Sequence, residues 1–296
     1  MKQYPVEFLK LSDGETLAYR TCGSGKRNLV LIHGNMSSSV HYQTLMERLE
    51  KDFTIYAVDM RGFGDSTYHK PFDTLKELAD EIGEFLRLKG IADPVLLGWS
   101  TGGGVVMELA ADLGDAVRGI ILLSSVALQG YPLLRKDETG APIEGAYLTT
   151  REEIAADPVQ VAPVLAAYPK NDREFFRAVW NAAIYQNGQP ETADYELYLD
   201  AILKQRNLLD IDYSLVHFNV TDQPSPVEPG SGRARLITCP VVLVHGESDL
   251  VVPVETARQA KEFFGEQAQL HILPGLSHSV VTDDTEALAG IVRQFA

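Results

Sequence analysis

The sequence predicts an α/β fold built on a mostly parallel, doubly wound sheet, and two observations carry this prediction. Continuous apolar runs at residues 28–34, 94–100 and 240–246 are typical of strands buried on both faces of a sheet. Stretches with helical periodicity, such as 40–50 and 74–90, lie between runs of this kind. Because strand–helix–strand units place their strands in parallel, the alternation predicts one sheet with helices on both faces.

The other elements of the core follow the same pattern. Two alternating runs at residues 6–12 and 16–22 are joined by Asp-Gly-Glu, which predicts a β-hairpin at the start of the chain. Apolar runs at 53–60 and 117–125 predict two more buried strands, and residues 105–113 predict the helix before the second of them.

The strand pattern stops after residue 128. The following segment contains helical pieces, for example 173–185 and 195–209, but no convincing buried strand. It ends in a stretch rich in Pro, Gly and Ser, 221–235, which predicts an ordered loop or hinge. Buried strands then return. The chain accordingly divides into a first core part, an inserted segment and a second core part: residues 1–128, 129–238 and 239–296.

Composition excludes several classes of partner. The chain has 296 residues, 45% of them hydrophobic, and a formal net charge of −15, which argues against nucleic acid and against anionic membranes. Neither a signal-peptide core nor an apolar stretch of about 18 residues is present, so we expect a cytoplasmic protein without membrane insertion. Cys22, Cys239 and the histidines lack the spacing of metal ligands, and we expect neither metal nor cofactor.

A serine lies where one buried strand meets its helix. Residues 98–102 read Gly-Trp-Ser-Thr-Gly, the G-x-S-x-G pattern in which a tight turn forces the serine into a strained conformation with its hydroxyl exposed. Gly98 and Gly102 would leave room for that turn, while Gly103 and Gly104 would let the helix approach the neighbouring strands. The motif predicts a nucleophile at Ser100; the alternative is a plain strand–turn–helix with an incidental serine.

A serine hydroxyl needs a base to remove its proton and an acid to orient that base. In folds of this layout the chain order is serine, acid, histidine. Asp249 follows the 240–246 strand and His278 follows the last strand, so both are predicted at the sheet edge that carries Ser100. Glu247 and Asp283 are the alternative acids.

The negative oxygen that forms on attack needs two N–H donors held in place. The backbone of Thr101, directly after the serine, is the first candidate. The second is predicted in the loop that follows the 28–34 strand, at the backbone of Asn35, with that of Met36 as the alternative.

These motifs together resemble the α/β-hydrolase superfamily: HGNMSSS, VDMRGFGDS, GWSTGG, HGESDLVVP and LPGLSH occur in the right order across both core parts. The resemblance implies an eight-stranded, mostly parallel sheet, with residues 129–238 as a helical lid inserted after strand 6. Members of this superfamily with an aspartate nucleophile, the dehalogenases and epoxide hydrolases, are excluded by Ser100.

More narrowly, HGNMSSS, RGFGDSTYH, GWSTGGG and QGYP resemble bacterial intracellular poly(3-hydroxybutyrate) depolymerases and related carboxylesterases. This resemblance implies an acyl-enzyme hydrolase of short-chain esters, extending to 3-hydroxybutyrate oligomers or polymer. A general carboxylesterase or lactonase is the nearest alternative. A ligand-binding receptor or regulator on the same fold is the alternative from another class.

The inserted segment is rich in aromatic rings, which either line an acyl pocket or pack into the segment's own core and its contact with the sheet. We expect the second arrangement for most of them. No cluster of Arg or Lys marks a site for phosphate or carboxylate, so a neutral ester is the expected substrate. The rings are Tyr131, Tyr147, Tyr168, Phe175, Phe176, Trp180, Tyr185, Tyr195, Tyr198, Tyr213 and Phe218.

Overall fold

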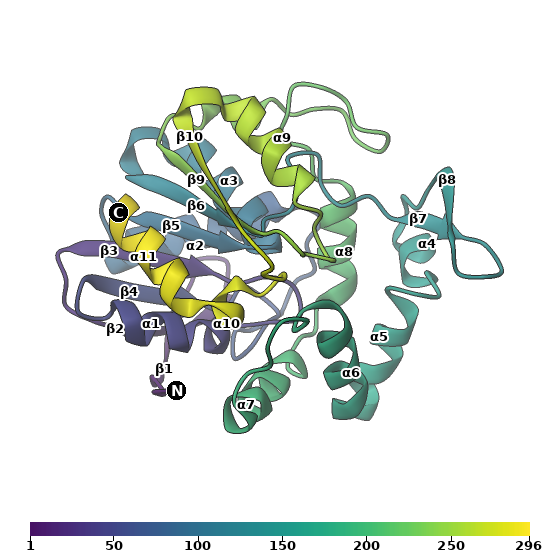
Figure 1. Cartoon of the computed structure of the whole chain (residues 1–296), viewed down its shortest axis with the longest axis horizontal. Coiled ribbons are helices and arrows are strands. Elements are labelled where there is room, and N and C mark those ends of the chain that lie inside the picture. The colour runs from purple at the N-terminus through teal and green to yellow at the C-terminus, as the bar shows by residue number, and fades with distance from the viewer.

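The computed structural model describes residues 1–296 and contains an eight-stranded sheet in the order β1-β2-β4-β3-β5-β6-β9-β10 (Figure 1). β2 is antiparallel to both β1 and β4, and all other neighbours are parallel, which confirms the predicted sheet. The strands are β1 (Val6–Lys10), β2 (Thr16–Cys22), β3 (Arg27–Ile32), β4 (Phe53–Val58), β5 (Val95–Trp99), β6 (Gly119–Leu123), β9 (Val241–Gly246) and β10 (Ala268–Leu273).

Helices cover both faces of this sheet. α2, α3 and α9 contribute to one large apolar cluster, whereas α1, α10 and α11 contribute to a second one on the opposite face. This two-sided cover explains why the central strands are apolar throughout, since each buries side chains in both clusters. The helices are α1 (Gln43–Leu49), α2 (Leu75–Lys89), α3 (Thr101–Leu113), α9 (Glu255–Phe264), α10 (Val280–Asp283) and α11 (Thr285–Phe295).

The register of the parallel strands brings their carboxyl ends to a common edge. Ile32 on β3 pairs with Gly98 on β5, and Trp99 pairs with Leu123 on β6, which in turn pairs with Val244 on β9. Each strand is followed at that edge by a loop. The loops that carry the predicted site residues therefore meet there, as expected for a doubly wound sheet.

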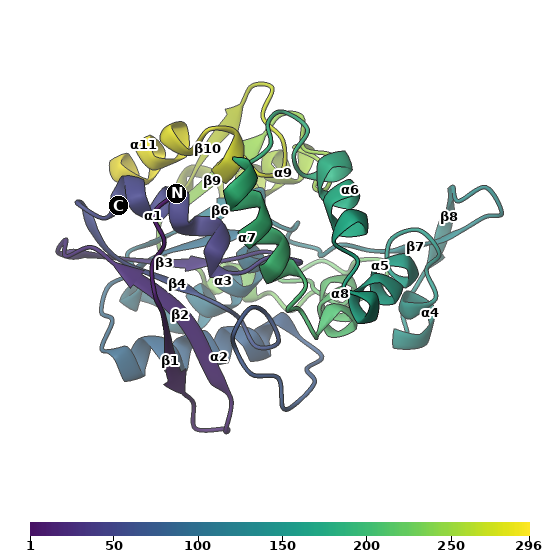
Figure 2. The same ribbon diagram turned by 90° about the horizontal axis from the view of Figure 1, so that it is seen from below.

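Residues 129–238 extend from this edge of the sheet (Figures 1 and 2). They form α4 (Arg151–Ala155), α5 (Ala162–Ala167), α6 (Arg173–Ala183), α7 (Thr192–Ile202) and α8 (Leu208–Val216). They also contain a small hairpin of β7 (Leu134–Lys136) and β8 (Pro142–Tyr147), which the sequence pattern did not predict. Most of β8 is exposed, so this hairpin carries no buried apolar run.

The helix expected over residues 195–209 is in fact two helices, α7 and α8, separated by residues 203–207. The buried side chain of Gln205 donates to Oδ1 of Asn35 at 2.7 Å, and that of Asn207 donates to the carbonyl of Arg61 at 2.6 Å. These bonds to two loops of the sheet domain hold the connecting residues outside helical geometry. The break is therefore an anchoring point between the inserted segment and the core.

The loop at 221–235 is ordered by its own hydrogen bonds. The Asn219 amide donates to the carbonyls of Gln223 and Glu228 at 2.8 and 3.2 Å, and Arg233 pairs with Glu108 and with Asp112 of α3. None of the helices combines the length and apolar character needed to cross a bilayer.

Candidate active site

Ser100 lies at the junction of β5 and α3 with φ 56° and ψ −120°, a backbone conformation that residues other than glycine rarely adopt. The glycines around it are required by close contacts. A Cβ on Gly98 would lie 2.3 Å from the carbonyl oxygen of Gly102, and one on Gly102 would lie 2.2 Å from that of Ile32. The turn can therefore form only with glycine at both positions, and it projects the serine from the sheet edge.

The next two glycines bring α3 close to its neighbours. A Cβ on Gly103 would lie 2.0 Å from Oγ of Ser125, and one on Gly104 would lie 2.6 Å from a methyl group of Leu75. The start of α3 is consequently packed against the loop after β6 and against α2. This packing fixes the position of Ser100 at the first turn of the helix.

Asp249 and His278 are brought together by the loops after β9 and β10. Nδ1 of His278 lies 2.7 Å from Oδ2 of Asp249, and both residues are buried. Oδ1 of Asp249 accepts the amides of Val251 and Val252 at 2.8 and 2.9 Å. The carboxylate is thus held by the turn of its own loop and directed at the imidazole.

Two opposing effects act on the Asp249 carboxyl. Burial raises its pKa, but hydrogen bonds from His245 and His278, the neighbouring charge of His278 and the Val252 amide outweigh burial and hold the pKa well below its usual range. The group is therefore ionised at neutral pH. An ionised carboxylate on Nδ1 leaves Nε2 of His278 free to act as an acceptor.

The two alternative acids are bonded elsewhere. Glu247 is exposed, and its carboxylate accepts the amide of Gly275 at 3.2 Å. The carboxyl of Asp283 accepts both the amide and the hydroxyl of Ser277 at 2.6 Å. Neither carboxyl is hydrogen-bonded to His278.

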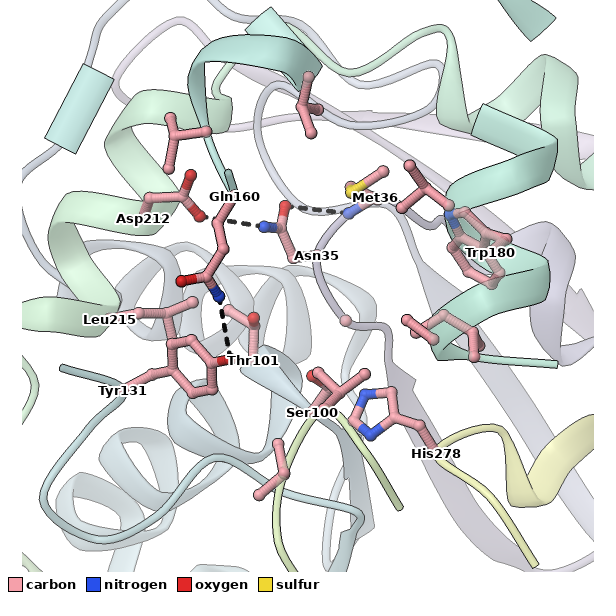
Figure 3. Close-up of a pocket in the computed structure, with 18 of the residues that line it drawn as sticks. Asn35, Met36, Ser100, Thr101, Tyr131, Gln160, Trp180, Asp212, Leu215 and His278 are labelled. Atoms are coloured by element: carbon pink, nitrogen blue, oxygen red, sulfur yellow. Dashed lines mark hydrogen bonds between the residues drawn. The ribbon is translucent and has the colours of Figure 1, made fainter. Parts of the chain in front are cut away.

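Ser100 and His278 lie side by side at the floor of a cavity, without a hydrogen bond between them (Figure 3). Contacts of this kind often shorten only when substrate is bound. The backbone of His278 is held in place, because the indole of Trp99 donates to its carbonyl at 3.0 Å.

The predicted oxyanion donors differ in whether their backbone N–H groups are free to bind a substrate oxygen. The backbone N–H of Asn35 has no hydrogen-bond acceptor in the protein, and the backbone N–H of Thr101, the first residue of α3, has no partner within the helix. The Met36 amide is already bonded to Oδ1 of Asn35 at 2.9 Å and to Oε1 of Gln205 at 3.0 Å. The arrangement favours Asn35 and Thr101 over the alternative that includes Met36.

The cavity has a volume of about 430 Å³ and is lined by 25 residues, of which 17 are hydrophobic. Three of the aromatic rings of the inserted segment line it: Tyr131, Phe175 and Trp180. Several of the others, including Phe176, Tyr195 and Tyr198, lie in the apolar cluster between the segment and the sheet. No group of three or more His, Cys, Asp or Glu side chains is arranged to hold a metal ion.

Three polar residues at this site were not identified from the sequence. Nε2 of His245 lies 3.2 Å from Oδ2 of Asp249 and 2.8 Å from the carbonyl of Val252; the spacing in HGESD, four residues before the aspartate, was the available signal. Gln205 and Asp212 both reach Asn35 from the inserted segment. The contacts of Gln205 and Asp212 join residues far apart in the chain, so no local sequence pattern predicts them.

Comparison with known proteins agrees with this architecture. The chain is 35% identical over 125 residues to a pimeloyl-[acyl-carrier protein] methyl ester esterase of Proteus mirabilis, a match spanning 41% of this chain and 46% of that protein. It is 25% identical to a non-heme haloperoxidase of Rhodococcus erythropolis over 98% of this chain and 99% of the relative.

Among solved structures, the esterase EaEST of Exiguobacterium antarcticum superposes with a TM-score of 0.74 at 19% identity, covering 97% of this chain and 98% of that one. At this level of identity the likeness concerns the fold. The family model described as Alpha/beta hydrolase family matches residues 29–291. This range contains most of β3, α1 and all later elements up to α11, and every predicted site residue. The chain belongs to the alpha/beta hydrolase family.

Proposed function

We propose that the chain is a serine hydrolase of carboxylic esters that works through an acyl-enzyme. The observation that carries the proposal is the buried Asp249–His278 pair beside Ser100 on the floor of an apolar cavity. Esterase relatives support an enzyme that acts on carboxylic esters. The cavity would hold the ester with its carbonyl carbon against Ser100.

In the proposed reaction, Oγ of Ser100 attacks the carbonyl carbon while Nε2 of His278 takes the hydroxyl proton. The amides of Asn35 and Thr101 donate to the oxygen that becomes negative. Collapse of the tetrahedral intermediate breaks the bond to the alcohol, which leaves with the proton from His278. A water molecule then repeats the same steps on the acyl-enzyme and releases the acid.

Residues 129–238 would act as the lid of this site. Helices of the segment supply much of the cavity wall, including Val164 of α5, Trp180 of α6 and Leu215 of α8. Their apolar side chains exclude water around the acyl group, which strengthens the electrostatic interactions of the oxyanion with its donors. The division into two core parts and a lid is thus a functional one.

The preferred substrates would be short-chain esters with about two to six acyl carbons, a range suited to a moderate, mostly apolar cavity. We extend the proposal to 3-hydroxybutyrate oligomers, because the motifs around Asn35, Arg61 and Ser100 resemble those of poly(3-hydroxybutyrate) depolymerases. The generic carboxylesterase differs from this enzyme only in failing to accept the oligomer.

The polyester assignment is tested by incubating the pure enzyme with 3-hydroxybutyrate trimer and with amorphous polymer. We expect monomer to be released, and we expect its release to stop after treatment with a phosphonylating inhibitor. Rapid turnover of p-nitrophenyl butyrate without any monomer would contradict the polyester assignment and leave the generic esterase. Absence of both turnover and phosphonylation would instead indicate the receptor alternative.

The pH profile tests the assignment of His278. We expect kcat/KM to rise with pH between pH 5 and 9, because protonated imidazole cannot accept the Ser100 proton. Asp249 adds no step in this range, since its low pKa keeps it ionised throughout. The measurement is kcat/KM for ethyl butyrate from pH 5 to 9; a flat profile would contradict a histidine base.

A further inference from the structure

The cavity contains one carboxyl group that the proposed reaction does not use. Asp212, on α8, lines the cavity wall, and its single hydrogen bond is accepted at Oδ1 from Nδ2 of Asn35 at 3.3 Å (Figure 3). No Lys or Arg lines the same cavity. A carboxyl placed among mainly apolar neighbours without a cation is costly for the fold, so a role toward a bound molecule is the natural explanation.

The surroundings favour the neutral form of this carboxyl more than water would. Burial raises the pKa of Asp212 to about 7, and the charge of Asp157 contributes in the same direction, against the hydrogen bond from Asn35. Oδ1 of Asp157 accepts the amides of Val159 and Gln160 at 3.0 and 2.5 Å, and Lys136 lies 3.8 Å from its other oxygen. These donors and the Lys136 ammonium stabilise a negative charge on Asp157, whereas Asp212 has no comparable set of donors.

The position of Asp212 in the cavity indicates which part of a bound ester it would face. Figure 3 shows Asp212, Gln160 and Tyr131 on the wall beyond Thr101, on the side of Ser100 away from His278. The departing alcohol must lie near His278 to receive its proton. The wall with Asp212 is therefore the one that faces the acyl chain.

We propose that Asp212 selects esters whose acyl chain carries a neutral hydroxyl group, which it binds by a hydrogen bond. This inference rests on the proposed ester hydrolysis and names the substrate class of that site. A hydroxyl both donates and accepts, so it can pair with either form of the carboxyl. An ammonium group would need several acceptors to replace its water, whereas a hydroxyl needs a single partner, and most of the cavity lining is apolar.

The test compares kcat/KM for ethyl butyrate with kcat/KM for its 2-hydroxy, 3-hydroxy and 2-amino derivatives. In the natural enzyme we expect at least one hydroxy ester to be favoured over the amino ester. At pH 9, above the pKa of about 7 that keeps part of the carboxyl neutral at lower pH, the ratio of that hydroxy ester to ethyl butyrate should fall about tenfold or more in Asp212→Leu, the loss expected for a hydrogen bond to a charged group. Glu152→Gln, an exposed acidic residue of α4, is the control and should leave the ratio unchanged.

Asp212→Asn covers the case in which the leucine variant fails to fold, because the amide oxygen can still accept from Asn35. At the same pH its ratio should fall about fivefold, since a neutral hydrogen bond replaces a charge-assisted one. A ratio unchanged in the variants that fold would overturn the inference while ester hydrolysis stands. A preference for the amino ester that depends on Asp212 would also overturn it. A natural enzyme that hydrolyses none of these esters would overturn the proposed function, and this inference with it.

Discussion

Replacing Ser100 by alanine should lower kcat for p-nitrophenyl butyrate by about 10⁶-fold, the loss typical of a serine nucleophile. The substitution removes the only atom that would form the acyl-enzyme. The thermal midpoint should change little, because the hydroxyl is not bonded to His278 and the backbone conformation of residue 100 is retained. Initial rates and circular dichroism melts measure the two quantities separately.

Ser248→Ala provides the matched control, since Ser248 is an exposed serine in the loop that carries Asp249. This variant should keep its activity and its reaction with phosphonylating inhibitors. Ser100→Ala should lose both while remaining folded. If the alanine variant retained more than a few per cent of activity after contaminating esterases were excluded, another nucleophile would have to be sought.

The sheet could be predicted from the sequence because its signals are local. Each central strand is buried on both faces and reads as a continuous apolar run, and the order of runs and helices fixes the parallel topology. Ser100, Asp249 and His278 each follow such a strand. Parallel strands end at one edge, so chain order alone predicted that the loops bearing these residues would meet.

The inserted segment was less predictable because its geometry depends on partners far away in the chain. The break between α7 and α8 exists because Gln205 and Asn207 bond to the loops of Asn35 and Arg61. Helical periodicity continues through the break, so it predicted one helix. Asp212 was missed for a similar reason: the sequence does not reveal that α8 turns this one carboxyl toward the cavity.

Asp249→Asn should lower kcat by roughly 10⁴-fold, the effect expected when the orienting carboxylate becomes an amide. The side-chain oxygen of the new asparagine would accept from the backbone N–H groups of Val251 and Val252, which donate to Oδ1 of Asp249 in the natural enzyme. Its NH₂ group would then face Nδ1 of His278. That contact makes Nδ1 an acceptor and places the proton on Nε2, the nitrogen that has to accept from Ser100.

His245 makes this substitution more damaging than at a site with a single histidine. Its Nε2 lies against both the Val252 carbonyl and Oδ2 of Asp249. Because a carbonyl can only accept, Nε2 of His245 must carry the proton of this contact. The new NH₂ group would therefore face a second N–H donor, and the hydrogen bond that Oδ2 accepts in the natural enzyme would be lost. We therefore expect the thermal midpoint to fall along with kcat, in contrast to the nearly unchanged midpoint of Ser100→Ala.

Glu247→Gln and Asp283→Asn are the matched variants, since each removes one of the alternative carboxylates. Glu247→Gln should retain most of the activity, because the carboxylate is exposed and bonded only to the Gly275 amide. Asp283→Asn should act mainly on stability, through the two bonds from Ser277. Suppose that one of these two variants lost activity 10⁴-fold while Asp249→Asn stayed active. The substituted residue would then be the acid of the triad, and the Asp249–His278 contact would have no catalytic role.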